Sequence, residues 1–302
     1  MSSEHDEYDV FLDNWEPSEI LEHATLASNL HDPFALARLL EDSTGAANLT
    51  RIAFVGGTKM MTDVEEQLRK YKFFEAHHAS WSEHFRDQVI SKGVDAANFD
   101  QFVHCFATDW VDGQRRRQDS LEMMAIKASI RDHDRQYHGK HAGRFVLSPV
   151  ADNVTPLFAP WEMAVIFEEN SGLLESLIPD YLDELEGDRG GSINRLYLRR
   201  GVRMPAVPGP LREELHYLSS YSLALSPVEQ FAQTWTKTTK DTGVPAIFSA
   251  PLPALQMRVV AFAPFIKGMD LRQLELVVAP PLEATMLKYR GTHGGIRDYE
   301  FE

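Results

Sequence analysis

The sequence has a single cysteine, few basic residues and no long hydrophobic run, and each shortage excludes a class of protein. One Cys among 302 residues excludes a disulfide framework and a zinc site built on several cysteines. No apolar run approaches the ~20 residues that a membrane-spanning helix needs, so we expect no membrane insertion. The lone cysteine fits a reducing, cytoplasmic location, and the acidic start of the chain is neither a secretory signal nor a transit peptide.

The charge is negative and unevenly distributed. Thirty Lys and Arg stand against 45 Asp and Glu, a formal net charge of −15, which argues against broad, non-specific binding to nucleic acid. Residues 1–22 carry eight of the acids and no Lys or Arg, interleaved with Tyr8, Phe11 and Trp15. We therefore predict an acidic N-terminal arm at residues 1–22 and a single domain at residues 23–302. The arm is either a solvated terminus or a segment that docks on a basic surface.

Two stretches are basic instead. Residues 113–144 hold eight Lys and Arg together with three histidines, and residues 189–203 hold five arginines and no acid. A ligand that carries phosphate would find its donors there. The alternative is that these residues form surface ion pairs and offset the acidic arm.

The predicted helices and strands do not alternate regularly along the chain. We expect helices from Pro33 and over residues 62–91, 118–130, 171–186 (broken at Pro179), 209–240 and 281–289. We expect strands over residues 51–55, 102–106, 144–147, 161–167, 195–203, 256–262, 274–279 and 296–301, with the last at a sheet edge. This order indicates an α+β fold with a mixed, largely antiparallel sheet, several helices and a helical N-terminal part. Cys105, in the second strand, is expected to be a core residue.

Common nucleotide-binding loops and the motifs of serine hydrolases and zincins are absent from the sequence. A polar segment that we predict to be a loop contains Asp132, His133, Asp134, His138 and His141. Histidine and carboxylate side chains together can hold a divalent metal ion, and loop histidines also contact phosphate near neutral pH. No local spacing fixes a coordination geometry. We therefore assign no metal ligand, and metal chemistry at these histidines stays an alternative.

Short motifs follow one another along the chain in a recognisable order. They are residues 62–66 (TDVEE) after a predicted strand, 104–107 (HCFA), 119–124 (DSLEMM), 141–145 (HAGRF), 263–265 (APF) and 274–280 (LELVVAP). In this order they resemble the motifs of a widespread prokaryotic family, domain of unknown function two-nine-seven-one. The resemblance implies site residues at Asp63, Glu65 and Asp119.

The opening strand of that family is similar to the one in ADP-ribosyltransferase folds, where a His holds the NAD ribose and a late Glu orients the attacked sugar. Residues 21–25 (LEHAT) keep the His and the Thr, so the resemblance implies that His23 contacts the ribose. The family's Glu-x-Glu-x-Arg strand has its counterpart in residues 255–258 (LQMR), which keep Arg258 but place Gln256 and Met257 where acids are expected. Because an amide cannot stabilise an oxocarbenium charge as a carboxylate does, Glu275 on the next predicted strand is the alternative.

Three functions therefore remain open. The first is an ADP-ribosyltransferase-like transferase in a toxin or phage-defence context that uses NAD or another nucleotide or small molecule. Its catalytic candidates are His23, Asp63, Glu65 and Glu275, and its substrate- or phosphate-binding candidates are Asp119, Arg131, His138, His141, Arg144, Arg199, Arg200 and Arg258. The second is a non-catalytic interaction or regulatory protein, with a protein partner or a second copy of itself, whose acidic arm docks on a basic surface. The third is metal chemistry at His133, His138 and His141.

Overall fold

The structure is a computed structural model, and it describes a defined part of the chain. The described residues are 52–54, 60–62, 64–110, 120–139, 153–186, 196–204, 211–213, 218–223, 228, 232, 244–271, 274–282, 285–293 and 296–301. The acidic arm, the helix predicted from Pro33 and the strand predicted at 144–147 lie outside these ranges.

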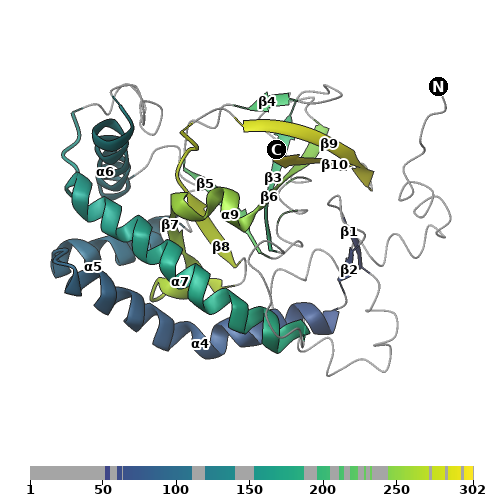
Figure 1. Ribbon diagram of the computed structural model, residues 1–302, viewed down its shortest axis with the longest axis horizontal. Helices are drawn as coiled ribbons and strands as arrows, with labels where there is room; N and C mark the ends of the chain where they lie inside the picture. Colours follow the sequence, from purple (N-terminus) through teal and green to yellow (C-terminus); the bar gives the residue numbers. More distant parts are fainter. Residues whose placement is uncertain are drawn as a thin grey trace.

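The helices α4, α5, α6 and α7 gather around the end of the main sheet that holds β7 and β8 (Figure 1). Their bounds, with the shorter helical segments, are α4 Val64–Ser91, α5 Ala96–His104, η2 Cys105–Trp110, α6 Leu121–His138, α7 Pro160–Glu186, α9 Leu252–Leu255, η5 Gln256–Arg258 and η6 Ala263–Phe265.

Local side chains and one glycine define where these helices begin and end. The Asp95 carboxylate accepts a hydrogen bond from the Asn98 backbone N–H at 2.9 Å, and the Ser120 hydroxyl accepts one from Met123 N–H at 3.1 Å. Each bond satisfies a backbone donor that the first turn of a helix leaves free, in α5 and α6 respectively. Gly93 follows the end of α4 with φ +97°, a conformation that glycine adopts without steric cost.

The described residues form two sheets. A small antiparallel pair contains β1 Ile52–Phe54 and β2 Met60–Thr62. The main sheet has the strand order β4-β9-β10-β6-β3-β5-β8-β7. Its strands are β3 Tyr197–Met204, β4 Leu211–Glu213, β5 Ser219–Ser222, β6 Val244–Pro251, β7 Val259–Phe262, β8 Glu275–Val278, β9 Thr285–His293 and β10 Ile296–Phe301. Only the β10–β6 pair is parallel among the pairings described, so the predicted α+β fold with a mixed, largely antiparallel sheet is confirmed.

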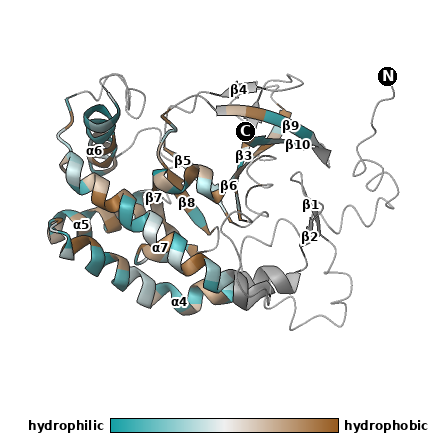
Figure 2. Cartoon of the chain, in the orientation of Figure 1, coloured by the Kyte–Doolittle hydropathy of each residue, from teal (hydrophilic) through white to brown (hydrophobic). Residues whose placement is uncertain are grey.

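Aromatic side chains fill the space between the helices and the β7 end of the sheet. The Phe74 ring lies 5.9 Å from Trp81, 4.9 Å from Tyr181 and 5.7 Å from Phe262, centroid to centroid, which joins α4, α7 and β7. Such pairs add roughly 0.5–1.5 kcal/mol each to the stabilisation from burial. Figure 2 shows that the long helices carry hydrophilic as well as hydrophobic residues, as expected for helices with one buried face.

Two polar side chains also attach α7 to the segment before and within β7. The Asn170 amide donates to the backbone oxygens of Ile166, at 3.1 Å, and Val260, at 2.8 Å. The Gln256 amide donates to the Ser171 hydroxyl at 2.9 Å. Residues 255–258 are thus helical and hold α7 in place. Of the strand predicted over residues 256–262, only residues 259–262 form a strand, β7.

Two segments predicted as strands are helical. Residues 102–106 lie at the end of α5 and in η2, where Phe99, Phe102 and Phe106 are all buried at helical spacing. Residues 161–167 lie inside α7, which continues through Pro179 because Ile178 and Tyr181 on either side are buried in the core. Aromatic and β-branched residues favour strands only weakly, and tertiary packing overrides that preference. Cys105 is buried, as expected, although it lies in a helical turn.

Three further predictions differ from the structure. The region 209–240 contains the strands β4 and β5, and the residues predicted as a helix at 281–289 lead into β9. The strand at 296–301 is present, but β10 lies between β9 and β6 and is not an edge strand. Hydrogen bonding to partners distant in sequence decides all three, and periodicity within a segment does not show such partners.

Candidate functional site

A row of polar residues crosses the main sheet. The strand registers pair Glu275 with Ser222, Ser222 with Arg199, Arg199 with Ser249, and Ser249 with Glu300. Residues paired across neighbouring strands point to the same face of a sheet, so these five side chains share one face. We call them the polar row.

The opposite face of the same strands carries the residues of the main core. The neighbours of the row residues in each strand are Leu198, Tyr221, Phe248, Leu276 and Tyr299, and all five are buried in one hydrophobic cluster. On the face of the polar row, a separate small cluster contains Val228, Ala232, Ile247 and Ile296. The row therefore lies on the less apolar side of the sheet, next to a small hydrophobic patch.

Arg199 is the cation of the row, and one of its donors has no acceptor. Its guanidinium carbon lies 5.6 Å from the centre of the Tyr197 ring, and its Nε is buried without a hydrogen-bond partner among the described residues. Burial lowers the pKa of the Arg199 guanidinium, while the charges of Asp298, Tyr197 and Glu300 oppose the shift. A guanidinium does not lose its proton in proteins, so Arg199 offers a fixed cation and a free N–H donor.

Two carboxylates of β10 lie close to Arg199 on the same face. Glu300 accepts a hydrogen bond from the Tyr197 hydroxyl at 3.3 Å and one from the Arg290 Nε at 2.6 Å. Asp298 is fully buried, and its Oδ1 lies 3.4 Å from the Ser249 hydroxyl that donates to it. Burial and the neighbouring Glu300 raise the pKa of Tyr197, which therefore stays a donor. The Glu300 carboxylate is thus held in one orientation near the half-buried Arg199.

Glu275, at the other end of the row, has a different environment. Its Oε1 accepts hydrogen bonds from the Trp110 indole N–H, at 2.7 Å, and from the Ser220 hydroxyl. Burial raises the pKa of the Glu275 carboxyl, and these two neutral donors oppose the shift only in part. Adjacent strands are about 4.8 Å apart, so four spacings put about 19 Å between the backbones of Glu275 and Glu300. The two carboxyls cannot act on one bond.

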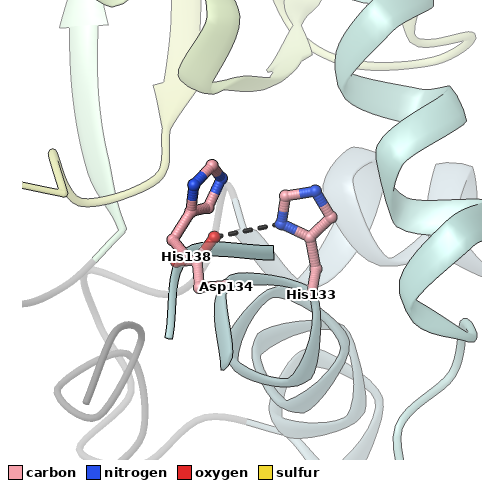
Figure 3. Close-up of side chains that lie close together, drawn as sticks. All are labelled: His133, Asp134 and His138. Carbon is pink, nitrogen blue, oxygen red and sulfur yellow. Dashed lines mark hydrogen bonds and ion pairs between the residues drawn. The ribbon is translucent and has the colours of Figure 1, made fainter. Parts of the chain in front are cut away.

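A second polar group lies beside α6 (Figure 3). Both oxygens of the buried Asp134 carboxylate accept hydrogen bonds from the Arg258 guanidinium at 2.8 Å, and Oδ1 also lies 3.0 Å from the Nδ1 of His133. Arg258 donates as well to the backbone oxygen of Pro280 at 3.0 Å and lies 5.2 Å from the centre of the Phe167 ring. The ion pair of Arg258 and Asp134, with these further contacts of Arg258, therefore joins α6, α7 and the ends of β7 and β8.

The pKa of Asp134 shows which effect is stronger in this group. Burial alone would raise it, but the hydrogen bonds from His133 and Arg258 and the charge of Arg258 bring it below the usual value of 3.8. Side-chain atoms of His133, Asp134 and His138 lie within 4.8 Å of one another, so this group also has the donors for a metal ion. His133 and His138 lie on helix α6, so the prediction of a loop there is wrong.

The described candidates from the sequence fall into two places. Glu275 and Arg199 lie in the polar row, and His138 and Arg258 lie in the Asp134 group. Arg131 joins neither group in the contacts described and donates to Asp132 at 2.8 Å, while Arg200 faces away from the row and donates to Ser219. The candidates His23, Asp63, Asp119, His141 and Arg144 lie outside the described residues, and of Glu65 only the backbone in α4 is described.

The sequence reading missed Ser249, Asp298 and Glu300. A signal for the two acids was present, because residues 296–301 alternate and therefore place Asp298 and Glu300 on one face of a strand. Ser249 carries no such signal, since it stands alone in an apolar strand.

Comparisons with known proteins add little to this geometry. No family model and no curated protein matches the chain, so the resemblance to the family of unknown function stays a prediction. Among solved structures, the chain is similar to Vis toxin, an ADP-ribosyltransferase from Vibrio splendidus, with 11% identity and a TM-score of 0.34 over 76% of this chain and 86% of that one. It is also similar to ADP-ribosyltransferase Vis in complex with M6 inhibitor, with 10% identity and a TM-score of 0.40 over 77% of this chain and 83% of that one. At these TM-scores the likeness carries no conclusion about this site. Among the described residues, no helix is both long and apolar enough to cross a membrane.

Replacing Glu275 with Gln should stabilise the protein at neutral pH. The folded-state pKa of Glu275 lies above its usual value of 4.5, so its ionisation costs native stability as the pH rises above 4.5. Gln keeps an oxygen acceptor for Trp110 and Ser220 and cannot ionise. Thermal unfolding followed by circular dichroism should give a higher Tm for Glu275→Gln than for wild type at pH 7 and no difference at pH 4. An equal or lower Tm at pH 7 would contradict the assignment, and exposed Glu83→Gln is the control.

Removing either partner of the Arg258–Asp134 pair should destabilise the protein strongly. Breaking a buried ion pair costs roughly 3–5 kcal/mol, so urea unfolding of Asp134→Asn at pH 7 should show a loss of that order. The pKa of Asp134 is lowered, so its contribution is present above the usual value of 3.8 and is lost as the pH falls through the lower folded-state value. The difference between the variant and wild type should therefore shrink in strong acid.

The matched control is the exposed pair of Arg86 and Asp100, whose side chains are 41% and 59% exposed. Asp100→Asn should change the free energy of unfolding by less than about 1 kcal/mol. If Asp134→Asn and Asp100→Asn lost a similar free energy of unfolding at pH 7, the buried Arg258–Asp134 pair would contribute no more to stability than an exposed pair.

Proposed function

We propose that this protein is an ADP-ribosyltransferase-like transferase that uses NAD as the donor of ADP-ribose. One observation supports the proposal above the others: in the polar row, a half-buried arginine whose Nε has no hydrogen-bond partner among the described residues lies two strands from an oriented carboxylate on the same face. A diphosphate needs a fixed cation with free donors, and a ribosyl cation needs a fixed anion. Two strand spacings, about 10 Å, can accommodate both parts of one ligand.

In this proposal two residues of the row, Arg199 and Glu300, take part in the reaction. Arg199, which is half-buried, provides the fixed positive charge that attracts the diphosphate of NAD. Glu300 stabilises the positive charge that develops on the ribose carbon as its bond to the nicotinamide nitrogen breaks. Nicotinamide leaves with the electron pair of that bond, and the acceptor forms the new bond to the carbon and releases a proton to solvent. Arg290 and Tyr197 keep the Glu300 carboxylate oriented.

Glu300 fits the carboxylate role better than Glu275, the candidate from the sequence. A group that stabilises a cation must be ionised, and burial among neutral donors disfavours the ionised form of Glu275. Glu300 instead accepts a charged hydrogen bond from Arg290. The proposal also keeps seven candidates from the sequence as cleft and substrate contacts: His23, Asp63, Glu65, Asp119, Arg131, Arg144 and His141. A cytoplasmic location and a toxin or phage-defence context are also part of it.

The test is NAD turnover by the purified full chain, with release of nicotinamide measured by chromatography and transfer of label from NAD to lysate proteins measured in parallel. Glu300→Gln should lower kcat about 100-fold or more, the usual loss when one preorganised charge is removed. Arg199→Lys should mainly raise KM, because lysine cannot reproduce the guanidinium geometry.

Exposed Glu83→Gln and Arg86→Lys are the matched controls and should behave like wild type. Absence of any nicotinamide release by the wild type would reject the proposal. Loss of turnover in Glu275→Gln with normal turnover in Glu300→Gln would transfer the carboxylate role to Glu275 and contradict the present assignment.

The second candidate function is protein interaction through the acidic arm of residues 1–22. It is favoured by eight acids without any Lys or Arg, interleaved with three aromatic residues that a solvated tail does not need. The arm would dock on a basic surface of a partner, or of a second copy of this chain. The remainder, residues 23–302, is then a single domain that folds without it.

Deletion of residues 1–22 tests this function. The shortened chain should unfold at the same temperature as the full chain but differ from it in oligomeric state on a sizing column or in partners recovered by pull-down. A variant with all eight acids changed to Asn or Gln is the matched control and should behave like the deletion. Identical oligomeric state and identical partners would contradict the role of the arm.

A further inference from the structure

We propose that His133, Asp134 and His138 form a binding site for a divalent transition-metal ion, with Zn²⁺ as the expected occupant. The site is separate from the polar row and does not depend on the proposed function. Side-chain donor atoms of the three residues lie within 4.8 Å of one another at the C-terminal end of α6 (Figure 3). Two imidazoles with one carboxylate are a ligand set that suits Zn²⁺ better than Mg²⁺ or Ca²⁺.

The distances need little adjustment to hold an ion. Zinc bonds of about 2.0–2.1 Å in a tetrahedron place neighbouring ligand atoms about 3.4 Å apart. The Nδ1 of His133 and the Oδ1 of Asp134 are 3.0 Å apart, and the rings of His133 and His138 are 5.8 Å apart between centroids. The ion would take the place of the hydrogen between Nδ1 and Oδ1, with the imidazole proton moved to Nε2. His138 would supply the third bond.

The helix end explains why such a site could be both rigid and accessible. His133 and Asp134 are buried against Phe167 of α7 and Arg258, which fixes their side chains. His138 is exposed and lies in the last turn of α6. Gly139, with φ +103°, then takes the chain out of the helix. An ion would therefore reach two buried ligands from the side where the third is open to solvent.

Arg258 limits the strength of the site and indicates its chemistry. Ligating carboxylates are usually held by a further hydrogen bond, and the guanidinium holds both Asp134 oxygens at 2.8 Å. The same cation repels a divalent ion, so Asp134 alone leaves the site with surplus positive charge. With three protein ligands, the fourth position stays open, and an anion or a hydroxide ion is the expected fourth ligand.

The test is titration of the full chain, prepared without a His tag and stripped with chelator, with Zn²⁺ in a calorimeter and with Co²⁺ in a spectrophotometer. We expect one ion per chain and the strong visible absorption of four-coordinate Co²⁺. His138→Ala should weaken binding at least about tenfold, since even residues that only support a ligand change metal affinity by 10–100-fold. His84→Ala removes an exposed histidine of α4 and should bind like wild type.

Each outcome of the metal titrations either supports or overturns the proposed site. Saturable binding that is lost in His138→Ala and kept in His84→Ala supports it, provided that circular dichroism shows both variants folded. Exposed His138 makes unfolding of that variant unexpected, and His138→Gln is a second variant that should also lose binding. Absence of saturable binding to the wild type, or equal affinity in wild type and both His138 variants, overturns it. NAD turnover plays no part in the readout.

Discussion

The lateral register of β8, β5, β3, β6 and β10 is the constraint on which both the core and the polar row depend. In each strand one residue belongs to the row and its neighbour is buried in the main core, so a slip of one residue would exchange the two faces. Burial of Leu198, Tyr221 and Tyr299 therefore fixes where Arg199, Ser222 and Glu300 lie. The same apolar packing that stabilises the fold also positions the charged groups of the site.

Two buried carboxyls of this protein show that the charge of the hydrogen-bond donor determines whether the pKa of a buried acid rises or falls. Asp134 and Glu275 are both buried, yet the pKa of Asp134 falls while that of Glu275 rises. The difference lies in the donors: Asp134 faces a guanidinium, whereas Glu275 faces an indole and a hydroxyl, which carry no charge. A buried acid in this fold is thus an anion where a cation from another element reaches it, and is harder to ionise elsewhere.

The sequence predicts local structure well where a segment is long or strictly alternating. The helix α4, the first part of α6 and the strands β3, β8 and β10 lie where periodicity predicts them, although α6 continues to His138, beyond the predicted end at residue 130. Short apolar runs such as residues 102–106 and 161–167 fit a strand or a helix equally well, and only the aromatic core selects the helix. Which side chains pair in the candidate sites is even harder to predict from the sequence. Arg258 and Asp134, for example, are 124 residues apart, and no local pattern links them.

Net charge says little about what this protein binds, because the charges that matter are few and local. The chain carries a formal net charge of −15, yet the half-buried Arg199 lies on the face of the sheet where Glu300 is already paired with Arg290. Coulomb interactions weaken over about 8–10 Å in physiological salt, so the acids of a 22-residue arm affect that face only where the arm contacts it. A negative net charge therefore does not exclude an anionic ligand at this face, because the charge that such a ligand would meet there is that of Arg199.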